Sequence, residues 1–238
     1  MPWPHIPLSA DPAAFPARPP ADLSDPAVIT AHDQGAFDAV ETMVDHWDRP
    51  GWTAQTRAYY WMLTFPSHPA LADLARRCQQ HLAPLGLDPV PNDGLHITLT
   101  RVGSAATLPL SRLDDVISAA VPLLPAAFRL RAVPLAGSRG AIRLTVTPWV
   151  PVLALHAALS ESMTPLGLDP HKPTALFRPH LSLAYNNRSR PAAPVIEAVT
   201  ALRDLPPVDL HVQEVQLVEL RREDRAYRWD VIKSVPLG

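Results

Sequence analysis

Two short stretches of this chain follow the same pattern, and together they restrict the folds open to it. Leu95-His96-Ile97-Thr98-Leu99 is the first motif, and Pro179-His180-Leu181-Ser182-Leu183 is the second. Successive side chains of a β-strand point to opposite faces, so each motif predicts a strand with a histidine and a hydroxyl on one face. The apolar residues anchor the other face. Two such strands would present two imidazoles and two hydroxyls to one cleft.

The rest of the chain mixes strand and helix patterns. Period-two or β-rich runs predict strands near 59–65, 95–102, 128–135, 141–147, 180–185, 208–220 and 227–235. Apolar residues at helical spacing predict helices near 71–82, 113–120, 152–166 and 195–202. Neighbouring strands that connect as hairpins favour an α+β fold with mostly antiparallel sheets over a doubly wound parallel sheet.

The N-terminal part has a different character. Proline recurs from Pro2 to Pro26, which predicts an extended arm because proline lacks a backbone donor and resists helix and sheet. Phe37, Val40, Met43 and Val44 then follow helical spacing, and Pro50-Gly51 would end that helix. We therefore divide the chain into an arm with a helical extension, 1–57, and a main domain, 58–238.

Charge and composition exclude several classes of function. The net charge of −2 argues against a protein that coats nucleic acid, but it permits a local cationic pocket for one phosphate. The single cysteine, Cys78, rules out an intramolecular disulfide and a cysteine-based zinc site, and its place on an apolar helix face predicts a buried thiol. Without a membrane-spanning stretch or signal-peptide pattern, we expect a cytoplasmic monomer with no membrane, metal or cofactor.

The paired motifs suit phosphodiester chemistry. A neutral imidazole can take a proton from water or a ribose hydroxyl, while an imidazolium gives one to the leaving oxygen. Thr98 and Ser182 can donate hydrogen bonds to the non-bridging phosphate oxygens. The alternative is that His96 and His180 are ordinary strand histidines bonded to nearby backbone. The pairing favours catalysis, because none of the other histidines has Ser or Thr two places on.

At these residues the sequence resembles the 2H phosphoesterase superfamily, in particular the 2′-5′ RNA ligase-like and RNA 2′,3′-cyclic phosphodiesterase proteins. Phe177-Arg178-Pro179 before the second histidine and Val102-Gly103 after the first motif extend the similarity. The resemblance implies two pseudo-symmetric lobes whose motif strands face a central cleft, with helices outside. It also implies action on RNA ends or small nucleotides: opening of 2′,3′-cyclic phosphates, cleavage of 2′-5′ linkages, or reversible 2′-5′ joining.

Two positions depart from that family pattern. Arg101 stands where many members have an aromatic or aliphatic residue, and Tyr185 stands where the RNA-acting members often have a basic one. Both put the substrate in question more than the reaction class. By strand alternation Arg101 lies on the face opposite His96, where it is either a phosphate clamp or a solvated arginine. Tyr185 likewise falls opposite His180, so a direct role would require a bulge.

Three further residues are candidates for substrate binding. Arg178 lies two places before His180 and so shares its face, as a phosphate ligand or a structural ion pair. Tyr60 and Trp52 belong to an aromatic-rich stretch before the first core strand. They either stack on a base or dock the N-terminal helix, and ordinary packing is the favoured interpretation.

Three functions remain open at this point. The leading hypothesis is a metal-independent phosphodiesterase with His96 and His180 as base and acid, in an order that depends on substrate orientation. The second is a binder of RNA ends or nucleotides without turnover. The third is a 2′-5′ RNA ligase, which would use the same residues in reverse.

Overall fold

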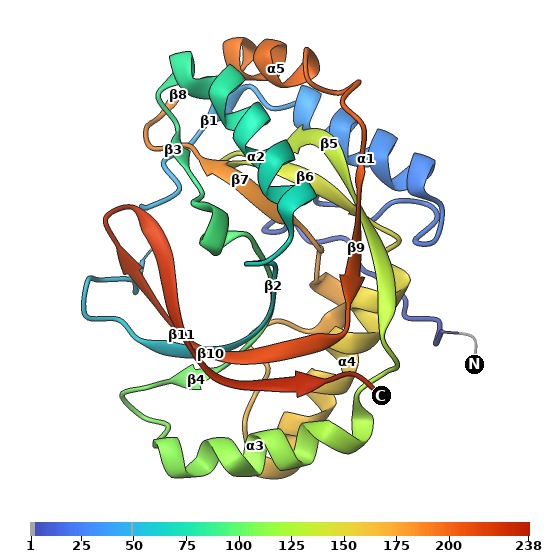
Figure 1. Cartoon of the computed structure of the whole chain (residues 1–238), viewed down its shortest axis with the longest axis vertical. Helices are drawn as coiled ribbons and strands as arrows, with labels where there is room; N and C mark the ends of the chain where they lie inside the picture. The colour runs from blue at the N-terminus through green and yellow to red at the C-terminus, as the bar shows by residue number, and fades with distance from the viewer. Residues whose placement is uncertain (1–2, 49) are drawn as a thin grey trace.

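A computed structural model describes residues 3–48 and 50–238 and has an α+β fold (Figure 1). The first sheet has the order β11-β10-β2-β4, from Ala226–Pro236, Glu214–Glu223, Ala58–Thr64 and His96–Ser104. The second has the order β3-β7-β6-β5-β9, from Asp88–Pro89, Leu181–Tyr185, Ala141–Thr147, Phe128–Gly137 and Val208–Val212. Strand pairs within both sheets are antiparallel, which confirms the predicted fold class.

In the part of the chain that the structure describes, five α-helices surround the two sheets; four of them contact strands, and α3 packs on α4. They are α1 (Pro26–Asp38), α2 (Pro69–Leu82), α3 (Leu113–Ala120), α4 (Val150–Met163) and α5 (Ala193–Thr200). Figure 1 shows α3 and α4 below the first sheet and α1, α2 and α5 above the second. Short 3₁₀ turns lie at Ala83–Leu85, Asn92–Gly94, Leu110–Arg112, Val121–Leu123, Thr164–Leu166 and Thr174–Leu176. Within the described ranges, no helix is both long and apolar enough to cross a membrane.

Two helices pack against the sheet to which the preceding strand does not belong. Helix α2 follows a strand of the first sheet but packs against β7 of the second sheet. Helix α4 follows β6 of the second sheet but packs against β4 of the first. The chain therefore crosses between the lobes repeatedly, and the motif strands β4 and β7 come to lie beside each other.

Helix α2 illustrates how local sequence sets these elements. Pro69 occupies the first turn of the helix. The His68 side chain caps the N-terminus of the helix, because its Nδ1 accepts a hydrogen bond from the Leu71 N–H at 3.3 Å. The apolar stripe that predicted the helix is buried, including Cys78. Burial raises the pKa of the Cys78 thiol to about 11, so this cysteine is a packing residue.

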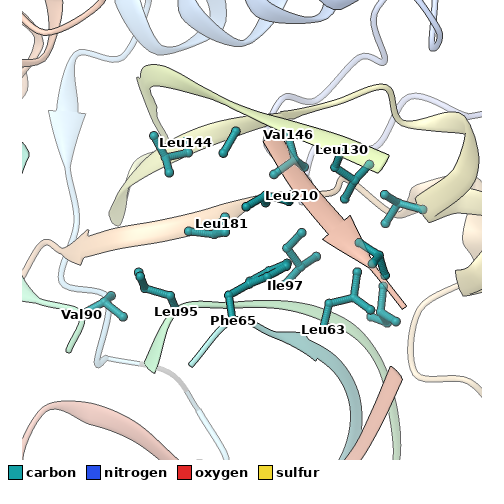
Figure 2. Packing of buried hydrophobic residues seen from close by; sticks show 14 of the residues in the cluster. Leu63, Phe65, Val90, Leu95, Ile97, Leu130, Leu144, Val146, Leu181 and Leu210 are labelled. Carbon is teal, nitrogen blue, oxygen red and sulfur yellow. The ribbon is translucent and has the colours of Figure 1, made fainter. Parts of the chain in front are cut away.

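The main apolar core lies between the two sheets (Figure 2). Ile97 from the first motif and Leu181 from the second point into the same apolar layer, together with Leu144 and Leu63. These residues are essentially inaccessible to solvent. Because neighbouring residues alternate across a strand, their burial directs the polar residues of both motifs away from the core.

The helix expected around residues 37–44 is wrong. Helix α1 ends at Asp38, and Thr42–Met43 instead form the short strand β1, which pairs with β8 (Arg190–Pro191). The helix lies upstream because the Asp25 carboxylate accepts from the Ala27 and Val28 amides, and Pro26 fits the first helical turn. The last proline of the arm thus starts a helix.

The expected strand at 208–220 is divided between the two sheets. Strand β9 pairs with β5 in the second sheet, whereas β10 pairs with β2 and β11 in the first. The chain changes sheet at Gln213, between the two strands. A continuous β pattern does not reveal such a change, because both strands are extended and half buried.

Candidate active site

The structure brings the two motifs together. His96, Thr98, His180 and Ser182 line one cavity of about 410 Å³. Strand β4 supplies the first pair, and β7 with the residue before it supplies the second. The geometry therefore gathers two imidazoles and two hydroxyls, one pair from each sheet, around a single ligand-sized space.

Both imidazoles are oriented in the same way. Nδ1 of His96 lies 2.7 Å from the Gly94 carbonyl oxygen, and Nδ1 of His180 lies 2.9 Å from the Arg178 carbonyl oxygen. In each motif the acceptor belongs to the residue two places before the histidine. A carbonyl can only accept, so each Nδ1 carries a proton, and Nε2 is the nitrogen that gains or loses one. Burial lowers the pKa of His96, although the Gly94 hydrogen bond opposes this effect.

Each motif strand contains a β-bulge at the same position. In β4, Thr98 pairs with Met62 and Thr100 pairs with Trp61, which leaves Leu99 as the extra residue. In β7, Ser182 pairs with Arg143 and Ala184 pairs with Ile142, which leaves Leu183 as the extra residue. The third residue after each histidine is therefore bulged.

The bulges correct the prediction made for Arg101. Arg101 pairs with Tyr60, two residues from Met62 along β2, so it returns to the face of Thr98 and His96. Tyr185 returns in the same way to the face of Ser182. Arg101 and Tyr185 occupy equivalent places after their histidines, and both line the cavity. Simple strand alternation, which ignores the bulges, predicts the opposite face for both residues.

The cavity is cationic although the chain carries a net charge of −2. Its described lining contains Arg101, Arg143, Lys172 and Arg178, and no aspartate or glutamate. The Nε of Arg101 is buried and has no hydrogen-bond partner among the described residues. Across 3–48 and 50–238, no group of three or more potential metal ligands gathers. A local cationic pocket suits an anionic ligand such as a phosphate.

The family model described as the 2′-5′ RNA ligase superfamily matches residues 65–224, which contain both motifs. This chain belongs to the 2′-5′ RNA ligase superfamily. E. coli LigT in its apo form has the same fold, with a TM-score of 0.55 and 17% sequence identity over 77% of this chain and 98% of LigT. TT0787 of Thermus thermophilus gives a TM-score of 0.54 and 20% identity over 77% and 98% of the two chains. No curated protein matches significantly.

Arg178 proves to be fully engaged by backbone carbonyls. Its five N–H donors meet five carbonyl oxygens, at distances from 2.6 to 3.5 Å. Three acceptors belong to the N-terminal arm, at Ser9, Pro16 and Ala17, and the other two belong to the loop before the second motif. Arg178 therefore lines the cavity, but its donors are directed to backbone carbonyls and hold the arm in place.

Arg143 is a cavity residue that sequence reasoning missed. It is buried in β6 directly opposite Ser182, donates to the Gly137 carbonyl oxygen at 3.0 Å, and lies 5.3 Å from the centre of the Phe15 ring. Burial lowers its pKa, whereas Asp33 opposes this. The available signal was a single charged residue within the otherwise uncharged strand pattern of 141–147.

The first-sheet end of the cavity is aromatic. Trp52, Tyr60 and Tyr227 line it, so both predicted aromatic candidates reach the cavity wall. His46 stacks on Tyr185 with ring centres 4.0 Å apart, and its Nε2 lies 3.0 Å from the Tyr227 hydroxyl. Sequence reasoning missed His46 and Tyr227, because neither stands in a recognisable pattern. In this member of the superfamily, residues on both sides of the matched region therefore line the cavity.

Proposed function

We propose that the protein is a metal-independent phosphodiesterase that acts on 2′,3′-cyclic phosphates or 2′-5′ phosphodiester bonds of RNA ends or small nucleotides. One observation carries the proposal: two imidazoles with matched backbone hydrogen bonds meet two hydroxyls in one cation-rich cavity. Membership of the 2′-5′ RNA ligase superfamily supports the same reaction class.

In the proposed reaction, His96 is the base and His180 is the acid. The lowered pKa of His96 keeps its Nε2 unprotonated near neutral pH, so it accepts the proton of the attacking water. The water oxygen bonds to phosphorus, the bond from phosphorus to the ribose 3′ oxygen breaks, and His180 protonates that oxygen. Thr98, Ser182 and Arg101 stabilise the charge on the non-bridging oxygens. The product is a 2′-phosphate.

The aromatic wall supports a nucleotide as the ligand. Tyr60, Trp52 and Tyr227 offer ring faces on which a base can stack, which contributes roughly 1–3 kcal/mol per base. E. coli LigT, which shares the fold, has been crystallised with 3′-AMP, with ATP and with NADP+. A cavity of about 410 Å³ falls within the size range of small-molecule sites.

The direct test is turnover of a 2′,3′-cyclic nucleotide and a 2′-5′ dinucleotide in the presence of EDTA. His96→Ala and His180→Ala should each lower kcat by about 10²–10⁴-fold, the usual contribution of a general acid or base. His211→Ala, an exposed histidine on β9, is the matched control. Wild-type kcat/KM should rise with pH through a value below 6.5, where His96 loses its proton, and fall once the acid is deprotonated.

The outcomes separate the competing functions. Equal turnover by wild type and both histidine variants would remove the catalytic proposal. Saturable nucleotide binding without product on any of these substrates would identify a binding protein. A ligated 2′-5′ product from cyclic phosphate and 5′-hydroxyl ends would show the same chemistry in reverse.

A further inference from the structure

The N-terminal arm reaches the cavity although it lies outside the family match. Ala13, Ala14 and Phe15 line the cavity, whereas the superfamily match begins at residue 65. The arm forms a closed turn here, because the Asp11 amide donates to the Ala17 carbonyl at 2.8 Å. The turn thus has a defined shape of its own.

The arm is also tied to the loop that precedes the second motif. The Ser9 amide donates to the Ala175 carbonyl at 2.8 Å, and Arg178 donates to the Ser9 and Pro16 carbonyls at 2.6 and 3.1 Å. Arg178 is itself buried. A buried guanidinium satisfied by backbone carbonyls loses those partners if the arm departs, so the docked position is the favoured one.

Phe15 stands at the second-motif end of the cavity. Its ring lies over the guanidinium of Arg143, and its carbonyl oxygen accepts from Arg143 at 3.4 Å. Arg143 in turn lies opposite Ser182 in the β6–β7 register. The aromatic ring is therefore fixed next to the residues that would hold the phosphate.

Two cavities reach the second motif, and residues of the arm line both of them. A second cavity of about 260 Å³ shares Ala13, Ala14, Phe15, His180 and Ser182 with the cavity already described. The arm turn therefore forms part of the wall beside His180 and Ser182 in both spaces.

We propose that Phe15 and the arm turn are specificity determinants. They close the second-motif side of the cavity and select mononucleotide or dinucleotide substrates over longer RNA strands. The proposal rests on the proposed function for its substrate class. A strand that continues past the phosphate on the second-motif side would meet the Phe15 ring and the backbone of the turn. A short nucleotide ends before it reaches them.

The test compares a short ligand with a long one in the full chain. Dissociation constants are measured for 3′-AMP and for a single-stranded oligoribonucleotide with a 3′-phosphate, and kcat/KM is measured for the matching 2′,3′-cyclic phosphates. Wild type should favour the short ligand. Phe15→Ala should strengthen binding of the long ligand by about tenfold, and leave 3′-AMP within about twofold. Phe15→Leu, which keeps much of the bulk, should stay near wild type.

Leu8→Ala is the matched control, because Leu8 lies in the arm and packs on the core without lining the cavity. It should leave the ratio of long to short ligand unchanged. The proposal is overturned if wild type binds both ligands equally, or if Phe15→Ala leaves the ratio as in Leu8→Ala. Binding without turnover would instead count against the proposed function while the binding ratio still tests the arm.

Discussion

At the scale of single residues, Arg101 best shows how a buried polar group points to a ligand. It shares the cavity face with His96 because Leu99 is bulged. Its buried Nε has no hydrogen-bond partner among the described residues, and no carboxylate lines the cavity beside it. An unsatisfied buried donor costs about 1–3 kcal/mol, and a bound phosphate would satisfy it with a charged hydrogen bond.

Arg101→Ala should therefore lower kcat/KM for a 2′,3′-cyclic nucleotide by about 10–100-fold, since hydrogen bonds to charged groups contribute about 1.5–3 kcal/mol. Arg101→Lys should recover only part of this loss, because lysine lacks the planar bidentate fork. Arg129→Ala, an exposed arginine on β5, is the control. Steady-state kinetics in which Arg101→Ala matches Arg129→Ala would show that the guanidinium does not contact the phosphate.

At the scale of elements, strongly periodic helices and strands can be predicted from the sequence, whereas local irregularities such as bulges cannot. The helix at Pro69–Leu82 and the strand at His96–Ser104 follow their patterns, because one face of each is buried in the core. The bulges at Leu99 and Leu183 have no signature in single residues, since a bulge adds an apolar residue to an apolar strand. The position of Arg101 relative to His96 could therefore not be predicted from spacing.

Helix α4 carries a further buried histidine, His156, which contacts the segment that leads to the second motif. His156 stacks on Phe177 with ring centres 4.3 Å apart, and its Nδ1 lies 2.8 Å from the Thr174 hydroxyl. Burial first, and Lys172 second, lower the pKa of His156 to about 4. The helix thereby positions the loop that leads to Arg178 and the second motif.

Because the pKa of His156 is lowered in the folded chain, we predict that the free energy of unfolding depends on pH. Its pKa is about 4 in the folded chain and near 6.5 when unfolded, so the unfolded state binds more protons between these values. Its contribution is fully present above pH 6.5 and is lost as the pH falls through 4, by about 3 kcal/mol. Between pH 6.5 and pH 4, urea unfolding should show a smaller decrease in the free energy of unfolding for His156→Gln than for wild type. His81→Gln, at an exposed site, should behave as wild type, and an unchanged slope in His156→Gln would refute the assignment.

At the scale of the whole molecule, segments far apart in the sequence pack together in ways that the sequence does not indicate. The proline-rich composition correctly indicated a segment with little regular structure before Pro26, but it gave no sign that the segment docks beside the second motif. Arg178 recognises backbone carbonyls of the arm, and every residue type carries such an acceptor. A contact of this kind leaves no pattern in the sequence. The exchange of α2 and α4 between the lobes is hidden in the same way.

Arg178→Met tests how firmly the arm belongs to the fold. Methionine has an unbranched side chain of similar length but none of the five donors, so the carbonyls of Ser9, Pro16 and Ala17 lose their partner. We expect a loss of about 2–4 kcal/mol in unfolding free energy, which lowers Tm by roughly 2–4 °C per kcal/mol. Hydrogen exchange should accelerate at the Ser9, Asp11 and Ala14 amides, which are bonded in the docked arm.

The exposed Arg18, on the same arm, provides the matched control as Arg18→Met. It removes the same charge without touching the buried carbonyls, so exchange and Tm should stay at wild-type values. Unchanged arm exchange in Arg178→Met would mean that the arm docks through its apolar contacts at Ile6, Leu8 and Leu23. Faster exchange confined to the arm, with α2 and β4 still protected, would instead show that it opens as a local unit while the two-sheet core stays folded.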